Sequence, residues 1–183
     1  MNKIIVIGGP SGVGKGTLIS DLVRQHPSYQ HVTAMTTRPL REGEVQGGNY
    51  FHISNAEFQK KLESGEIIEH TVHFGNYYGI SKKIVEDILK RGKTPIKDCD
   101  YIGLFALRAA FGVENVISIW LDAPFEEVVK RLRGRGGSEQ DIYNRINDYH
   151  EHVKTSRGHY SHFVNNLDMQ QCIKDIITII EKS

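Results

Sequence analysis

The feature that most constrains this chain is a glycine-rich segment between a short apolar run and an amphipathic pattern. Ile4 to Ile7 is a continuous β-branched run, which is typical of a parallel strand buried on both faces. Apolar residues then recur at helical spacing from Leu18 to Val23 and stop before Pro27. Between them, the glycine spacing followed by Lys15 fits a phosphate-binding loop, so the unit reads strand, loop, helix.

The chemistry of this loop suits a polyphosphate. Glycines let backbone N–H groups turn inward around phosphate oxygens, and a helix N-terminus adds partial positive charge. Gly16 stands where the strict motif has the Ser or Thr that ligates Mg²⁺, and Thr17 comes one residue later. We therefore expect Mg²⁺ to be held mainly by nucleotide oxygens and waters. The residues predicted to bind ATP here are Gly9, Pro10, Ser11, Gly12, Val13, Gly14, Lys15, Gly16 and Thr17.

Further apolar runs indicate an α/β fold. Thr94 to Ile96 and Val116 to Leu121 are each followed by a helical pattern, and this alternation predicts a central parallel sheet flanked by helices. Residues 34–80 differ, with closely spaced turn residues, short aromatic strands and a helix capping box that starts at Ser54. We interpret this stretch as an inserted mixed-β lobe, and the Gly- and Arg-rich segment 133–137 as a mobile loop.

Composition narrows the function classes. The 183 residues are 39% hydrophobic and 25% charged, which is enough for one globular domain with a substantial core. The net charge of only +1 argues against bulk nucleic-acid binding. The two cysteines, Cys99 and Cys172, have no metal-site spacing, and the first apolar run is too short for a signal segment or a membrane span. We expect a cytoplasmic protein that binds neither membranes nor nucleic acid.

Several further motifs, taken together, resemble guanylate kinase in order and spacing from Ile4 to about Asn165. Besides the loop, they are Thr36 to Arg41, Gly43 to Tyr50, Gly75 to Gly79, Asp98 to Asp100 and Arg131 to Gly136. The resemblance implies a P-loop nucleoside monophosphate kinase that transfers the ATP γ-phosphate to GMP with Mg²⁺. It also implies a core at 1–33 and 81–183, an acceptor-binding lobe at about 34–80 and a mobile lid at about 134–141.

The resemblance assigns roles to individual residues. It implies that the acceptor site is formed by Arg38, Arg41, Tyr50, Glu69, Tyr78, Asp98 and Asp100. Because Asp98 follows a buried strand opposite the loop, it is also well placed to orient magnesium waters. It implies that catalysis rests on Lys15, Arg41, Arg135 and Arg145, and that Arg131 and Asn165 lie near the donor nucleotide. The chemistry agrees, because a planar guanidinium binds phosphate bidentately. A carboxylate at Glu69 accepts hydrogen bonds from guanine N–H groups, a pattern that adenine does not offer.

Three positions depart from the family pattern near the acceptor base. Ala34 and Ile80 stand where guanylate kinases carry hydroxyls that bind guanine, and Ile102 replaces a Gln. Two lost hydrogen bonds predict roughly five- to hundredfold weaker GMP binding unless something compensates, and Ser81 is a candidate replacement. Two alternatives stay open: a changed acceptor such as dGMP, IMP or another monophosphate, and a non-catalytic phosphopeptide-binding module. The retained donor loop and lid arginines disfavour the second.

Overall fold

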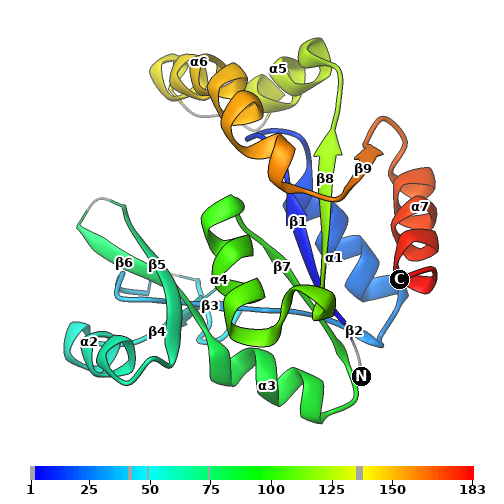
Figure 1. Ribbon diagram of the computed structural model, residues 1–183. Helices are drawn as coiled ribbons and strands as arrows, with labels where there is room; N and C mark the ends of the chain where they lie inside the picture. Colours follow the sequence, from blue (N-terminus) through cyan, green and yellow to red (C-terminus); the bar gives the residue numbers. More distant parts are fainter. Residues whose placement is uncertain (1–2, 41–42, 49, 74, 135–137) are drawn as a thin grey trace.

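A five-stranded parallel sheet forms the centre of the molecule (Figure 1). The computed structural model describes residues 3–40, 43–48, 50–73, 75–134 and 138–183. The strand order is β2-β7-β1-β8-β9, and every neighbouring pair is parallel. The strands are β1 (Ile4–Gly8), β2 (Tyr29–His31), β7 (Thr94–Asp98), β8 (Val116–Asp122) and β9 (His162–Asn165).

Helices cover both faces of this sheet, which explains the continuous apolar run in β1. Ile5 and Ile7 point into a cluster with α1 (Lys15–Gln25) and α7 (Met169–Glu181). Ile4 and Val6 point into a second cluster with α3 (Lys82–Lys90) and α4 (Tyr101–Phe111). A strand between two helical layers is buried on both sides, so the predicted α/β architecture of a P-loop fold is confirmed.

A second, smaller sheet lies beside the first, at the left in Figure 1. Its order is β4-β3-β6-β5, and it is mixed, because β3 pairs with β4 in parallel while β6 runs antiparallel to both of its neighbours. The hydroxyl of Ser54 accepts a hydrogen bond from the Glu57 amide, as the predicted capping box requires. The elements are β3 (Ala34–Thr36), β4 (Tyr50–His52), α2 (Asn55–Glu63), β5 (Ile67–His73) and β6 (Asn76–Ser81).

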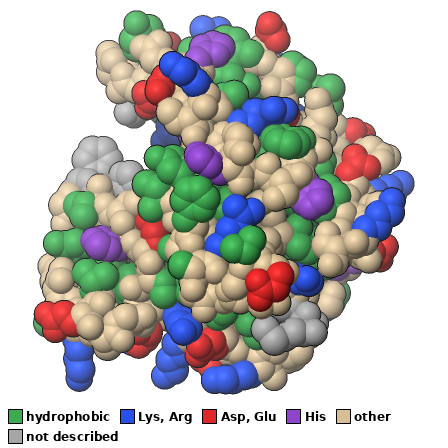
Figure 2. Space-filling model, viewed as in Figure 1, with side chains coloured by type: hydrophobic (Ala, Val, Ile, Leu, Met, Phe, Trp, Pro, Cys, Tyr) green, Lys and Arg blue, Asp and Glu red, His purple; other side chains and the backbone are tan. Residues whose placement is uncertain are grey.

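Two helices lie above the carboxyl end of β8, at the top in Figure 1. They are α5 (Phe125–Gly134) and α6 (Glu139–Ser156). The surface is hollowed between these helices and the small sheet (Figure 2). The predicted lid covers the end of α5 and the start of α6, and its residues 135–137 lie outside the described residues. Among the described helices, none combines the length and the apolar character that crossing a membrane requires.

Candidate active site

The glycine-rich loop leaves the carboxyl end of β1 and needs its glycines. Gly9, Gly12 and Gly14 have φ angles of +142°, +85° and +104°, a region that favours residues without a Cβ. A Cβ on Gly14 would lie 2.5 Å from the amide nitrogen of Asn166, and one on Gly9 would lie 2.8 Å from a backbone carbonyl. The loop therefore depends on glycine both for its backbone path and for the close approach of its neighbours.

Lys15 is the first residue of α1, and its side chain turns back over the loop. Its ammonium donates hydrogen bonds to the carbonyl oxygens of Gly9 at 2.7 Å and Pro10 at 3.1 Å. The charge is thus held at the mouth of the loop, next to the helix N-terminus. This arrangement is that of an anion site, in which backbone amides and one cation act on the same group.

Three side chains from distant parts of the chain fix the loop from outside. Arg131 on α5 donates to the carbonyl of Val13 at 3.0 Å, and the amide of Asn166 donates to the same oxygen at 2.8 Å. Arg145 on α6 donates to the hydroxyl of Ser11 at 2.8 Å. The predicted donor-site residue Arg131 and the predicted catalytic residue Arg145 are therefore both brought to the loop.

The predicted donor residue Asn165 makes no hydrogen bond with the described loop, whereas its neighbour Asn166 does. Asn165 is exposed at the end of β9, where it pairs with Asp122. Asn166 is 1% exposed and binds the loop backbone. Sequence reasoning missed Asn166, although its place just past a strand on the carboxyl edge of the sheet was the available signal.

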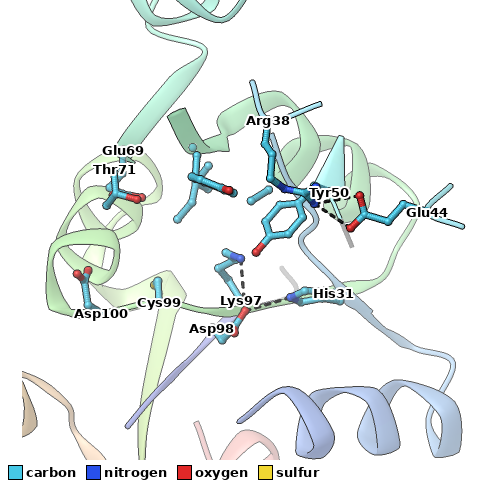
Figure 3. A pocket seen from close by; sticks show the side chains of 14 residues that line it. His31, Arg38, Glu44, Tyr50, Glu69, Thr71, Lys97, Asp98, Cys99 and Asp100 are labelled. Carbon is cyan, nitrogen blue, oxygen red and sulfur yellow. Dashed lines mark hydrogen bonds and ion pairs between the residues drawn. The ribbon is translucent and has the colours of Figure 1, made fainter. Parts of the chain in front are cut away.

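A cavity of about 820 Å³ opens between the two sheets (Figure 3). Most of its polar lining comes from the small sheet and from the end of β7. The lining residues are His31, Ala34, Arg38, Glu44, Tyr50, Glu69, Thr71, Tyr78, Gly79, Ile80, Lys97, Asp98, Cys99 and Asp100. All the predicted acceptor residues are among them except Arg41, which lies outside the described residues, as does the predicted catalytic Arg135.

One end of the cavity carries an arginine and two tyrosines. Arg38 donates to both carboxylate oxygens of Glu44, at 2.8 and 3.0 Å, and its guanidinium lies 5.9 Å from the ring centre of Tyr50. The rings of Tyr50 and Tyr78 meet edge to face at 5.4 Å. Figure 3 places Arg38, Tyr50 and Glu44 on one side of the cavity, away from Glu69. A guanidinium beside phenol groups is a suitable receptor for a phosphate.

The other end of the cavity carries two carboxylates. Burial and the nearby negative charge of Asp100 raise the pKa of Glu69 to about 7. The positive charge of Lys97 opposes this rise but does not cancel it. The carboxylate of Glu69 forms no hydrogen bond or ion pair with another described residue, so this desolvated group is open to a ligand. Asp100 is partly engaged, because one of its oxygens accepts the amides of Ile102 and Gly103 as the N-cap of α4.

Asp98 lies where the cavity meets the donor loop. Burial alone would raise its pKa, but the hydrogen bond from His31 and the charges of Lys97, His31 and Lys15 lower the pKa well below its usual range. His31 lies 3.2 Å and Lys97 3.4 Å from the same carboxylate oxygen. Asp98 is therefore ionised at neutral pH. It lines the cavity and also interacts electrostatically with Lys15 of the loop.

The two side chains that contact Asp98 in the cavity were both missed from the sequence. His31 ends the short strand β2, which no apolar pattern predicted. Lys97 is only 9% exposed within β7, and a lysine inside a buried strand is a signal of a paired or functional charge.

Comparison with known proteins agrees with the geometry. The family model described as "Guanylate kinase" matches residues 1–183. Proteins named guanylate kinase from Trichormus variabilis and Chlorobium chlorochromatii are 39% and 41% identical, over 84% and 76% of this chain and 77% and 73% of their own lengths. The chain belongs to the guanylate kinase family. The crystal structure of guanylate kinase from Anaplasma phagocytophilum superposes with a TM-score of 0.73 at 27% identity, over 99% of this chain and 85% of that one.

Membership of the guanylate kinase family identifies the chain as an ATP-dependent phosphotransferase, as the motifs indicate. Among the described residues, no group of three or more His, Cys, Asp or Glu side chains forms a metal site. Asp98 is an ionised carboxylate on β7 next to β1, which leads into the donor loop, and such an oxygen donor suits a hydrated divalent cation.

The departures from the guanylate kinase pattern have different surroundings. Ala34 and Ile80 are buried and line the cavity. The wall of the cavity therefore lacks a hydroxyl at both of these positions. Ile102 is 50% exposed on α4 and is not among the lining residues. Ser81 was expected as a replacement, and this expectation is wrong. Its buried hydroxyl donates to Glu66 at 3.1 Å and caps α3, so it is not part of the cavity lining.

Proposed function

We propose that this protein transfers the γ-phosphate of ATP to GMP and releases ADP and GDP. One observation carries the proposal: a single cavity has an open carboxylate at one end and an arginine–tyrosine group at the other, and it adjoins a phosphate-binding loop at Asp98. Such a cavity suits a nucleoside monophosphate whose phosphate points to the donor. Family membership supports this activity, and neither a changed acceptor base nor a peptide-binding role is favoured.

The donor side would bind ATP through the loop from Gly9 to Thr17, with Arg131 and Asn165 near the nucleotide. Lys15, Arg145, Arg41 and Arg135 would neutralise the phosphoryl group as it moves. Phosphoryl transfer asks a protein mainly to align two phosphates and to spread positive charge over the transition state. Support comes from the hydrogen bonds that Lys15 and Arg145 donate to the loop, because they place both positive charges there.

The acceptor side would bind GMP in the cavity. Arg38, Arg41, Tyr50 and Tyr78 would hold its phosphate, while Glu69 and Asp100 would hold guanine. The raised pKa of Glu69 supports the assignment, since a carboxylate without a protein partner gains most from two ligand N–H donors. AMP presents an acceptor at its ring nitrogen where GMP presents a donor, so Glu69 would reject it.

Mg²⁺ would accompany ATP, and when bound it would neutralise phosphate oxygens. Asp98 would approach it through water. Asp98 would also remain ionised throughout the neutral range because of its His31 and Lys97 contacts.

We further propose a division into three parts: a core of residues 1–33 and 81–183, an acceptor-binding lobe of about 34–80 and a lid of about 134–141. The small sheet supports the lobe boundaries, because its strands begin at Ala34 and end at Ser81. Closure of a lid over the cavity would exclude water from the reaction. A cytoplasmic location also remains our proposal, and the free thiols of Cys99 and Cys172 suit a reducing compartment.

An assay of ADP release tests the function. GMP, dGMP, IMP, AMP, CMP and UMP are compared as acceptors, and a Lys15→Ala variant gives the background. We expect GMP to have the highest kcat/KM. Preference for another monophosphate would move the assignment to that acceptor, and no stimulation by any of them would refute the kinase activity.

A further inference from the structure

The cavity face of the small sheet can be read as rows of opposed side chains. Glu69 pairs with Ile80, and Thr71 pairs with Tyr78. Thr36 pairs with Tyr78 from the other side. Directly opposed residues of antiparallel strands project to the same face, as do residues two apart along one strand. Glu69, Thr71, Tyr78 and Ile80 accordingly all line the cavity.

Few hydroxyls on this face are available to a ligand. Ala34 and Ile80 have none. Thr36 donates to the carbonyl of Tyr77 at 2.8 Å and accepts from the amide of Arg38 at 3.1 Å, so its hydroxyl is already used. Thr71 is different: within the described part of the chain its hydroxyl has no hydrogen-bond partner, and it faces the cavity.

Thr71 lies at the end of the cavity that would hold the base. Figure 3 shows Thr71 beside Glu69, on the side of the cavity away from Arg38 and Glu44. Two residues along a strand are separated by about 6.6 Å, so one bound purine can contact both side chains. A hydroxyl both donates and accepts, which matches the mixed donors and acceptors on the edges of guanine.

Resting on the proposed function, we propose that Thr71 is a specificity-determining residue whose hydroxyl hydrogen-bonds the guanine base held by Glu69. It takes over from the hydroxyls that are absent at Ala34 and Ile80. Glu69 supplies the carboxylate for the N–H donors, and Thr71 supplies a neutral contact beside it. The cavity thus keeps a neutral polar contact to the base, supplied from β5 rather than from β3 or β6.

The test compares Thr71→Val, which keeps the shape and removes the hydroxyl, with Thr71→Ser, which keeps the hydroxyl. We expect Thr71→Val to lower kcat/KM for GMP by roughly threefold to tenfold, mainly through KM, and to weaken GMP binding at equilibrium by the same factor. Thr71→Ser should stay within about twofold of the parent protein. An unchanged melting temperature for both variants shows that the fold is retained.

Two controls separate base reading from other roles. Val72→Thr places a hydroxyl on the opposite, exposed face of the same strand, where Val72 is 54% exposed, and should change nothing. Ribose 5-phosphate, used as a competitor of GMP, occupies the phosphate end without a base, so its inhibition constant should be equal in the parent and in Thr71→Val. An equal weakening for ribose 5-phosphate and GMP would overturn base reading by Thr71.

The equilibrium measurement keeps this inference separate from the proposed function. If the parent binds GMP without phosphorylating it, the kinase activity fails, while the binding series still decides the role of Thr71. If the parent is an active GMP kinase and Thr71→Val binds GMP as tightly as the parent does, Thr71 is not a specificity determinant. The same conclusion follows if the parent does not bind GMP.

Discussion

The donor loop and the acceptor cavity are built on opposite plans. In the loop, three side chains donate hydrogen bonds to the backbone: Lys15 binds the Gly9 carbonyl, and Arg131 and Asn166 share the Val13 carbonyl. In the cavity, the side chains of Glu69 and Thr71 make no hydrogen bonds with other described residues. The loop is organised before its ligand arrives, whereas the cavity leaves polar groups open for a ligand to satisfy. On the proposed function, binding of the ATP phosphates and choice of the acceptor base belong to different regions.

Removing the charge of the loop should give the largest effect. We expect Lys15→Ala to lower kcat/KM by about 10³-fold, because the moving phosphoryl group loses a fixed cation. Affinity for GMP should stay within about twofold, since Lys15 does not line the cavity. Steady-state kinetics and GMP titration measure the two quantities, with Lys90→Ala on the exposed side of α3 as the control. A tenfold loss of GMP affinity would break the separation of the two regions.

Changing the open carboxylate should give the mirror result. Glu69→Gln replaces one acceptor oxygen with an amide that opposes a guanine N–H, so kcat/KM for GMP should fall by about 10²-fold. The KM for ATP should be unaffected. Glu86→Gln is the matched control. Glu86 is exposed on α3, and its ion pair with Lys82, at 4.0 Å, is a surface pair that contributes little. A fall in ATP affinity equal to that for GMP would contradict the assignment of Glu69 to the acceptor.

The same contrast explains what could be predicted from the sequence. The loop is local: its strand, glycines, lysine and helix are contiguous from Ile4 to Gln25, so spacing alone predicted it. Its outer contacts are not local. Asn166 is 153 positions from Val13, and nothing in the sequence alone says which of two adjacent asparagines turns inward.

The cavity depends on strand register, which is why less of it could be read in advance. Arg38, Glu69 and Asp100 were assigned by resemblance rather than by any local pattern. The pairing of β5 with β6 shifts register between Ile67 and Glu69, and such a bulge changes which side chains face the cavity. Before that register is known, Thr71 is one more polar residue on a short strand. Ser81 was chosen by adjacency, and the end of β6 turns it away.

The protonation of Glu69 should make only the acceptor side sensitive to pH. On the proposed function, guanine N–H groups bind the ionised carboxylate of Glu69. Because burial raises the pKa of Glu69 to about 7, the KM for GMP should rise as pH falls below that value. Between pH 8 and pH 6 the rise should be roughly tenfold. The phosphate of GMP also titrates near pH 6. The ratio of parent to Glu69→Gln removes that contribution, and a ratio independent of pH would refute the raised pKa.

Protonation of Glu69 also affects the stability of the free protein. GMP binding favours the ionised carboxylate, whereas folding favours the protonated one. Because folding raises the pKa of Glu69, its favourable contribution is present below the pKa of the unfolded chain and is lost as pH rises through about 7. The Tm of Glu69→Gln without ligand should therefore exceed that of the parent by more at pH 8 than at pH 5. Thermal unfolding at both pH values measures the difference, and an equal difference would show that Glu69 is solvated in the free protein.

The smallest expected kinetic effect distinguishes the hydroxyl of Ser81, outside the cavity, from that of Thr71, which lines it. Ser81→Ala should lower the free energy of unfolding by about 1–2 kcal/mol, because Ser81 caps α3 and donates to Glu66, and should leave kcat/KM for GMP within about twofold. Ser54→Ala removes a cap from α2 and is the matched control for helix capping alone. A tenfold fall in kcat/KM for GMP in Ser81→Ala without loss of stability would instead indicate that Ser81 contacts the base. Thr71→Val should show the reverse pattern, since an open hydroxyl contributes to binding and not to folding.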